Sequence, residues 1–69
     1  MPSSGKQAIK MLLDEGFVIA RERGSHVVLT KHSNGAKLTT VVPLHKELKR
    51  GTIRSIAKLA GLLPKDFGL

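Results

Sequence analysis

Two turn signals divide the middle of this 69-residue chain into three segments with strand-like composition. The first signal is Gly24-Ser25 and the second is Asn34-Gly35. Asn-Gly between strand-like residues is the strongest short-range indication of a β-hairpin, because both residues tolerate the positive φ angles of a tight turn. The two turns therefore predict three consecutive strands, over residues 17–23, 26–32 and 37–42, in an antiparallel meander.

A helix is predicted on the N-terminal side of these strands, over about residues 4–15. Its apolar residues recur at helical spacing, and Gly16 follows at the position that commonly ends a helix. Ser4 and Gln7 have the spacing of a capping box, in which each side chain accepts a hydrogen bond from the other residue's backbone N–H. This pattern places the start of the helix at Ser4.

A second helix is predicted after a polar connector that runs from Leu44 to Gly51. Thr52 is the expected N-cap, and Gly61 stands at the expected end. A last helical turn is predicted over residues 64–67, which would return Phe67 to the core. The apolar stripe of this second helix is formed by Ile53, Ile56, Ala57 and Ala60.

This order of elements predicts an α+β fold of the double-stranded-RNA-binding-domain type, α-β-β-β-α. Neither helix can bury its apolar stripe alone, so both are expected to pack on one face of a three-stranded antiparallel sheet. A chain of this length forms one domain, which is expected to span residues 1–69.

The charge of the chain predicts a polyanionic partner. Twelve Lys and Arg stand against five Asp and Glu, a net charge of +7. Nucleic acid, an acidic protein or an anionic membrane surface would all fit, as would a small protein that happens to be basic. The only aromatic residues are Phe17 and Phe67, whereas domains that stack bases need exposed rings. Any nucleic acid is therefore expected to be held through its phosphates and its shape.

The chain has no cysteine, which excludes disulfides and thiolate metal sites and fits a reducing compartment. No apolar run could span a bilayer and no secretory signal is visible, so a cytoplasmic protein without membrane contact is expected. The three histidines match no zinc spacing and the five acids are scattered. No metal or other cofactor is therefore expected.

Three histidines are the only side chains that titrate near neutrality. His26 follows a turn and has two arginines nearby; it is either a strand residue that flanks the turn or a general acid or base beside phosphate-binding groups. His32 adjoins the Asn-Gly turn and is expected at the surface. His45 precedes a basic connector and could bind a phosphate or cap a turn. The sequence also does not decide which face of its strand His26 occupies, because both alternating sets contain apolar residues.

A basic stripe is predicted on the second helix, where Arg50, Arg54 and Lys58 recur every four residues. Stacked like charges destabilise a helix slightly. The stripe is either a solvated face or a docking surface for RNA backbone or an acidic partner.

The combination of motifs closely resembles the HicA toxin family, and the likeness covers nearly the whole chain. It rests on five stretches in this order: Gly16-Phe17, Arg21, Gly24-Ser25-His26, Val42-Pro43 with His45, and Gly51-Thr52-Ile53-Arg54-Ser55-Ile56. The resemblance implies the same α-β-β-β-α fold and a ribonuclease that cleaves mRNA and arrests translation and growth. It also implies the toxin half of a type II toxin–antitoxin pair, blocked by a HicB-type antitoxin that we expect to be acidic.

The resemblance assigns the single catalytic histidine of the family to His26. Metal-free cleavage uses the ribose 2′-OH as nucleophile, and an imidazole, with an ordinary pKa of about 6.5, can act as base or acid. His45 is the best guess for a second catalytic group. The alternatives are a non-catalytic RNA-binding domain of similar fold and a basic protein bound to ribosomal RNA. The residues expected to contact RNA are Arg21, Arg23, Gly24, Ser25, Lys31, His45, Lys46, Lys49 and Arg50.

Overall fold

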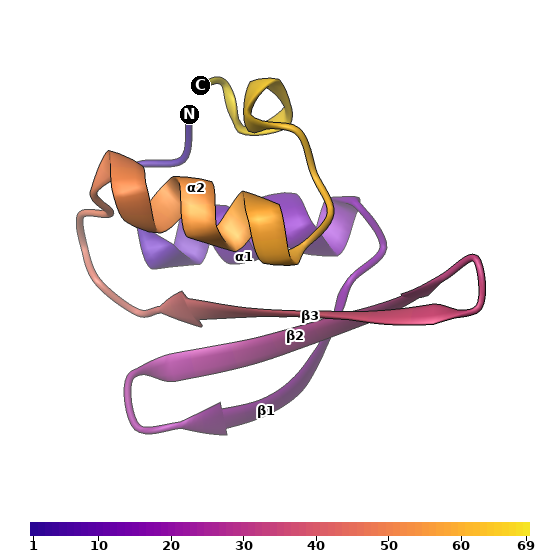
Figure 1. The fold of residues 1–69 in the computed structure, drawn as a ribbon. Coiled ribbons are helices and arrows are strands. Elements are labelled where there is room, and N and C mark those ends of the chain that lie inside the picture. The colour runs from indigo at the N-terminus through magenta and orange to yellow at the C-terminus, as the bar shows by residue number, and fades with distance from the viewer.

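The computed structural model describes residues 1–69 and has the predicted order of elements (Figure 1). The strands form one antiparallel sheet in the order β1-β2-β3, and both helices lie on the same side of it. The α+β prediction is therefore confirmed. The elements are α1 (Gly5–Asp14), β1 (Val18–Arg23), β2 (His26–Ser33), β3 (Ala36–Pro43), α2 (Arg50–Leu59) and a short 3₁₀ helix, η1 (Pro64–Phe67).

The core lies between the sheet and the two helices. The apolar stripe of α2 packs against the inward-facing residues of β2 and β3, and Phe67 folds back into this layer, as predicted. No helix of the chain is long and apolar enough to cross a membrane. The largest fully buried side chains of the core are Leu12, Val27, Leu29, Val42, Ile53, Ile56 and Phe67.

The two hairpin turns have the expected geometry. Asn34 and Gly35 both have positive φ angles, 52° and 79°, which is the requirement of a type I′ turn. Gly24 has a φ of 56°, a conformation that glycine adopts without a steric penalty. Pro43, which has no N–H to donate, is the last residue of β3.

The cap of α1 differs in one detail from the predicted capping box. The Ser4 hydroxyl accepts a hydrogen bond from the Gln7 backbone N–H at 3.2 Å, as expected. The Gln7 side-chain oxygen, however, accepts from the backbone N–H and the hydroxyl of Ser3, at 2.7 and 2.8 Å, and not from Ser4. The reciprocal half of the box is therefore displaced by one residue.

Helix α2 begins three residues earlier than predicted, so the assignment of Thr52 as N-cap is wrong. The N-cap is Lys49, without a side-chain hydrogen bond, and its carbonyl accepts from the Ile53 N–H at 3.0 Å. Leu48 is buried and its N–H donates to the Ser3 carbonyl at 2.9 Å. This anchor fixes the chain just before Lys49, and Gly51 continues the first turn of the helix instead of ending the connector.

One buried polar contact joins the sheet to α2. Thr40 is fully buried on the helix side of β3 and its hydroxyl donates to the Ile56 carbonyl at 3.0 Å. A buried hydroxyl needs such a partner to offset its loss of water. The contact therefore fixes how α2 lies across β3.

Candidate active site

Strand alternation places His26 on the face of the sheet that is turned away from the helices. Val27 and Leu29 are buried in the core, so the alternating residues of β2 point the other way. His26 is exposed there. We call this surface the open face; the structure thus resolves a question that the sequence left undecided.

His26 lies at one end of the open face between two cross-strand neighbours. Arg23 of β1 is paired with it on one side, and Pro43 of β3 on the other. Directly opposite residues of antiparallel strands have Cα atoms about 4.5–5.5 Å apart. The turn Gly24-Ser25, which joins β1 to β2, is exposed and adjoins the same pair. The structure therefore brings Arg23, Gly24, Ser25 and His26 together, as expected from the sequence.

A β-bulge in β1 decides which side chains accompany His26. Ile19 is paired with Leu29, but Arg21 is paired with Val28, so Ala20 is an extra residue in β1. Because the extra residue shifts the alternation, Arg21 and Arg23 both lie on the open face and Glu22 lies on the helix side. Bulges commonly redirect side chains next to functional sites, and this one was not foreseen from the sequence.

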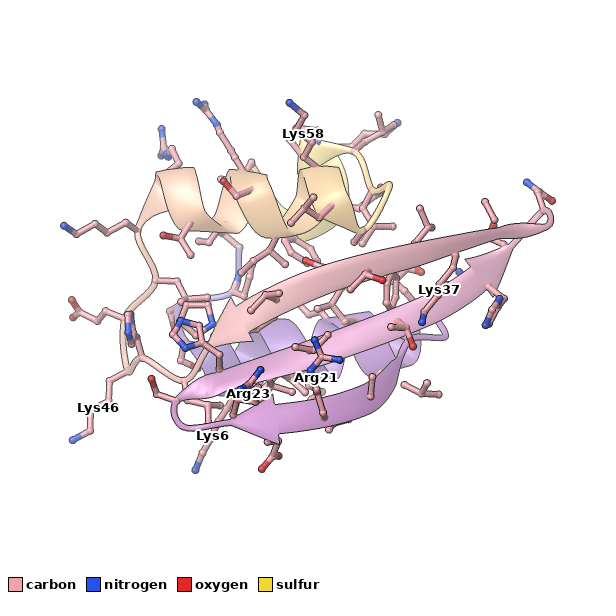
Figure 2. The ribbon with its side chains drawn as sticks, turned by 60° about the horizontal axis from the view of Figure 1, so that its bottom comes forward. Lys6, Arg21, Arg23, Lys37, Lys46 and Lys58 are labelled. Carbon is pink, nitrogen blue, oxygen red and sulfur yellow. The ribbon has the colours of Figure 1, made fainter.

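The open face carries cationic and neutral side chains but no carboxylate. Figure 2 shows Arg21 and Arg23 projecting over the strands and Lys37 at the opposite end of the sheet. The middle of the face is aliphatic: Val28 is only 8% exposed, whereas Val41 and Val18 are 39% and 60% exposed. By strand register, the residues of the open face are Val18, Arg21, Arg23, His26, Val28, Thr30, His32, Lys37, Thr39, Val41 and Pro43.

His45 and Lys46 are exposed in the connector after β3, at the His26 end of the sheet. The Leu44 N–H donates to the Ser25 carbonyl at 2.6 Å, which ties the start of the connector to the turn beside His26. The His45 carbonyl accepts from the Gly5 N–H at 2.9 Å, which ties it to α1. His45 and Lys46, both expected to contact RNA, therefore lie close to the His26 region, although neither is hydrogen-bonded to His26.

Lys31 does not lie with the other expected residues. It faces the helix side of β2, where its ammonium group donates to the Glu15 carbonyl at 2.6 Å and lies 5.9 Å from the centre of the Phe17 ring. A cation at this position stabilises the C-terminal end of α1, where the last carbonyls lack helical partners. Lys31 therefore has a structural role at the end of α1.

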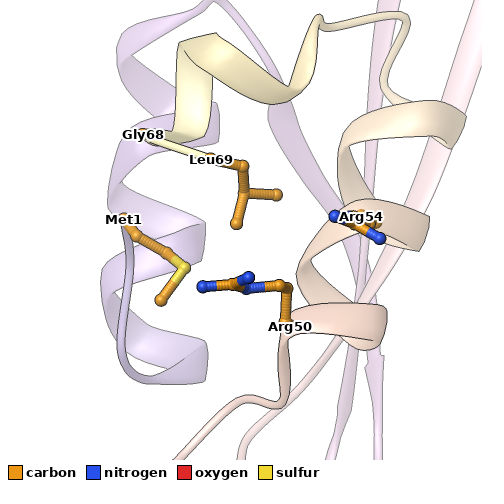
Figure 3. A pocket seen from close by; sticks show the side chains of 5 residues that line it. All are labelled: Met1, Arg50, Arg54, Gly68 and Leu69. Atoms are coloured by element: carbon orange, nitrogen blue, oxygen red, sulfur yellow. The ribbon is translucent and has the colours of Figure 1, made fainter.

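Lys49 and Arg50 also lie apart from His26, at the start of α2 in the helical layer. Figure 3 shows Arg50 and Arg54 beside the two chain ends, around a cavity of about 180 Å³. The stripe Arg50, Arg54 and Lys58 is exposed, as predicted. The basic surface of the molecule is thus divided between the open face and the outer side of α2.

The side chains at the His26 end include Lys6, which sequence reasoning missed. Figure 2 shows Lys6 and Lys46 projecting from the same end of the sheet as Arg23. The available signal was Gly5, because a glycine in the first turn of a helix often marks a close backbone approach. Nowhere in the structure do three or more His, Asp or Glu side chains group as a metal site would require.

One comparison with known proteins found a match and another found none. A family model described as "HicA toxin of bacterial toxin-antitoxin" matches residues 5–62, which include all three strands, both helices and His26. A comparison with curated proteins found no match. Because the family model covers most of the chain, this protein belongs to the HicA toxin family of bacterial toxin–antitoxin systems.

Proposed function

We propose that this toxin is an endoribonuclease that cleaves mRNA in the cytoplasm without a metal ion, with His26 as its acid–base residue. The observation that carries the proposal is the position of His26: exposed, paired with Arg23, and on a face without carboxylates. A polyanion can approach such a face without like-charge repulsion. The scattered acids and histidines support a mechanism that relies on the protein's own side chains.

The proposed reaction is an intramolecular displacement at phosphorus. A base removes the proton of the ribose 2′-OH, and the 2′-oxygen forms a bond to the adjacent phosphorus. The bond from phosphorus to the 5′-oxygen breaks, and an acid protonates that oxygen. The products are a 2′,3′-cyclic phosphate and a 5′-hydroxyl. His26 provides one of the two proton transfers, which typically accelerates a reaction by about 10²–10⁴-fold.

Arg23 and Arg21 stabilise the negative charge that develops on the phosphorane. Guanidinium groups donate paired N–H bonds that match phosphate oxygens. Arg23 is the closer of the two, because it is the direct partner of His26, whereas Arg21 is opposite Val28. Preorganised donors of this kind supply a large part of the rate enhancement in many enzymes.

The open face is also the surface through which we propose that a HicB-type antitoxin inhibits the toxin. Its aliphatic middle and basic edge suit a partner with an apolar centre and carboxylates that pair with Arg21 and Arg23. Such a partner would cover His26 and exclude RNA. Association should then be fast at low ionic strength and slow as salt is added, so a salt-independent association rate would contradict this surface.

The second candidate function is RNA binding without catalysis, which the basic surface would also support. Purified toxin incubated with single-stranded RNA and a chelator separates the two. The proposal predicts cleaved RNA with cyclic phosphate ends in the presence of the chelator. Intact RNA that is nevertheless bound would support the binding domain. A protein that associates stably with ribosomes and is not toxic on expression would support a ribosome-associated protein.

A further inference from the structure

A surface depression of about 370 Å³ lies where α1 meets the connector after β3. No acidic side chain lines it, and three of its five residues carry nitrogen donors at the ends of their side chains. Glu47, the nearest acid along the chain, is not among the lining residues. The depression is lined by Ser4, Lys6, Leu44, His45 and Lys46.

The walls of this depression are held by backbone contacts. The Gly5 N–H donates to the His45 carbonyl and the Leu48 N–H donates to the Ser3 carbonyl, both at 2.9 Å. Gly5 is buried, and a Cβ at this position would collide with the Pro43 carbonyl oxygen. The absence of a side chain at Gly5 is therefore what allows α1 to approach the end of β3 and bring Lys6 beside His45.

Two backbone N–H groups at the start of α1 are already used inside the protein. The Gly5 N–H is already bonded to the His45 carbonyl, and the Gln7 N–H to the Ser4 hydroxyl. Two lysines and an imidazole remain as donors around an open space. The ligand chemistry that matches two ammonium groups without a carboxylate is a phosphate group.

The depression lies next to the His26 region. Leu44, one of its lining residues, directly follows the cross-strand partner of His26 and is bonded to Ser25. Strand dimensions place the Cα atoms of His26 and His45 within about 13 Å of each other. A single RNA strand bound at His26 can therefore extend one or two nucleotides into the depression.

We infer that Lys6, His45 and Lys46 form a second phosphate subsite, which binds a phosphate of the RNA strand next to the one that is cleaved. The inference rests on the proposed ribonuclease function and deepens it. His45 is then a binding residue and not the second catalytic group. The subsite explains how a toxin with two aromatic residues can hold a single strand without stacking its bases.

The test measures RNA binding separately from cleavage. A labelled single-stranded RNA is titrated with the His26→Ala protein at several salt concentrations. The titration is repeated with a variant that carries Lys6→Ala and Lys46→Ala in addition to His26→Ala. Each neutralised phosphate contributes about 0.7 to the slope of log affinity against log salt for single strands, so losing the one phosphate held at this subsite should lower the slope by about 0.7. The matched control adds Lys58→Ala and Lys65→Ala, which remove the same charge from α2 and η1; Figure 2 shows Lys58 in the helical layer.

The results separate the subsite from the proposed function. An unchanged slope for the control together with the expected fall for Lys6→Ala and Lys46→Ala supports the subsite, whether or not the wild-type protein cleaves RNA. Equal changes in the salt slope for the Lys6/Lys46 variant and the Lys58/Lys65 control would overturn the subsite, even if the wild-type protein cleaves RNA. An absence of RNA binding at low salt would overturn both the subsite and the proposed ribonuclease function. In the wild-type background, His45→Ala should raise KM for cleavage with kcat unchanged; a fall in kcat alone would contradict its assignment as a binding residue.

Discussion

Arg23 and His26 are cross-strand partners on the open face, at the two-residue turn that joins β1 to β2. This pairing depends on the bulge at Ala20, which turns the arginines of β1 toward the open face and Glu22 away from it. The local backbone thus separates the two arginines from the one acid in the strand. A phosphate that reaches His26 meets a guanidinium group and no carboxylate.

Arg23→Ala should lower the RNA cleavage rate by about 10²-fold, the loss typical of one charge-stabilising donor in an active site. The matched control is Arg54→Ala, which removes the same charge from the outer side of α2 and should cleave RNA close to the wild-type rate. Single-turnover cleavage assays at saturating protein measure both variants. Equal losses for the two arginines would mean that only the net charge of the toxin matters.

Lys31→Met should destabilise the protein by about 1 kcal/mol while the cleavage rate of the folded protein stays the same. The methionine keeps most of the aliphatic chain but removes the ammonium group that bonds to the Glu15 carbonyl, and hydrogen bonds from charged groups contribute about this much or somewhat more. Urea denaturation measures the change. Lys37→Met is the control, because Lys37 is exposed on the open face and surface substitutions usually change stability by less than about 0.5 kcal/mol. Similar midpoints for the two variants would show that Lys31 does not stabilise the end of α1.

Replacing either of two helical glycines by alanine should change the stability of the protein, in opposite directions. Gly5→Ala places a methyl group against the Pro43 carbonyl, so we expect a loss of about 1–3 kcal/mol from forced displacement of α1. Gly51→Ala meets no atom within 4 Å and should stabilise the protein by about 0.5–1 kcal/mol, because alanine is the better helix former. Thermal unfolding of both variants checks the pair. A neutral Gly5→Ala would contradict the close approach that shapes the depression beside His45.

Much of the fold follows from local signals in the sequence. The two turns set the three strands, since Asn34-Gly35 has the backbone angles that its residue types favour. The start of α2 was less predictable. Thr52 has the side chain of an N-cap, but the buried Leu48 and its bond to Ser3 fix the chain earlier. A tertiary contact between distant segments thus overrode a local preference.

The site was predictable where neighbours in sequence are neighbours in space, as for Gly24, Ser25 and His26. The face of β2 on which His26 lies could not be predicted, because Val28 on the open face is as apolar as Val27 in the core. Val28 is largely buried between its cross-strand partners Arg21 and Val41. Lys31, five residues from His26, faces the other side of β2, and its contact with RNA stays a prediction. The bulge at Ala20 and the contact between Gly5 and His45 leave no periodic signal in the sequence.

The most direct test of the account compares two histidines of the same strand. His26 and His32 are both exposed on the open face of β2, so replacing either by alanine removes the same group from the same surface. With RNA and a chelator, His26→Ala should lose cleavage by at least about 10²-fold while keeping its fold and its antitoxin binding, and His32→Ala should cleave RNA like the wild type. A folded His26→Ala protein that cleaves RNA at the wild-type rate would contradict the central claim.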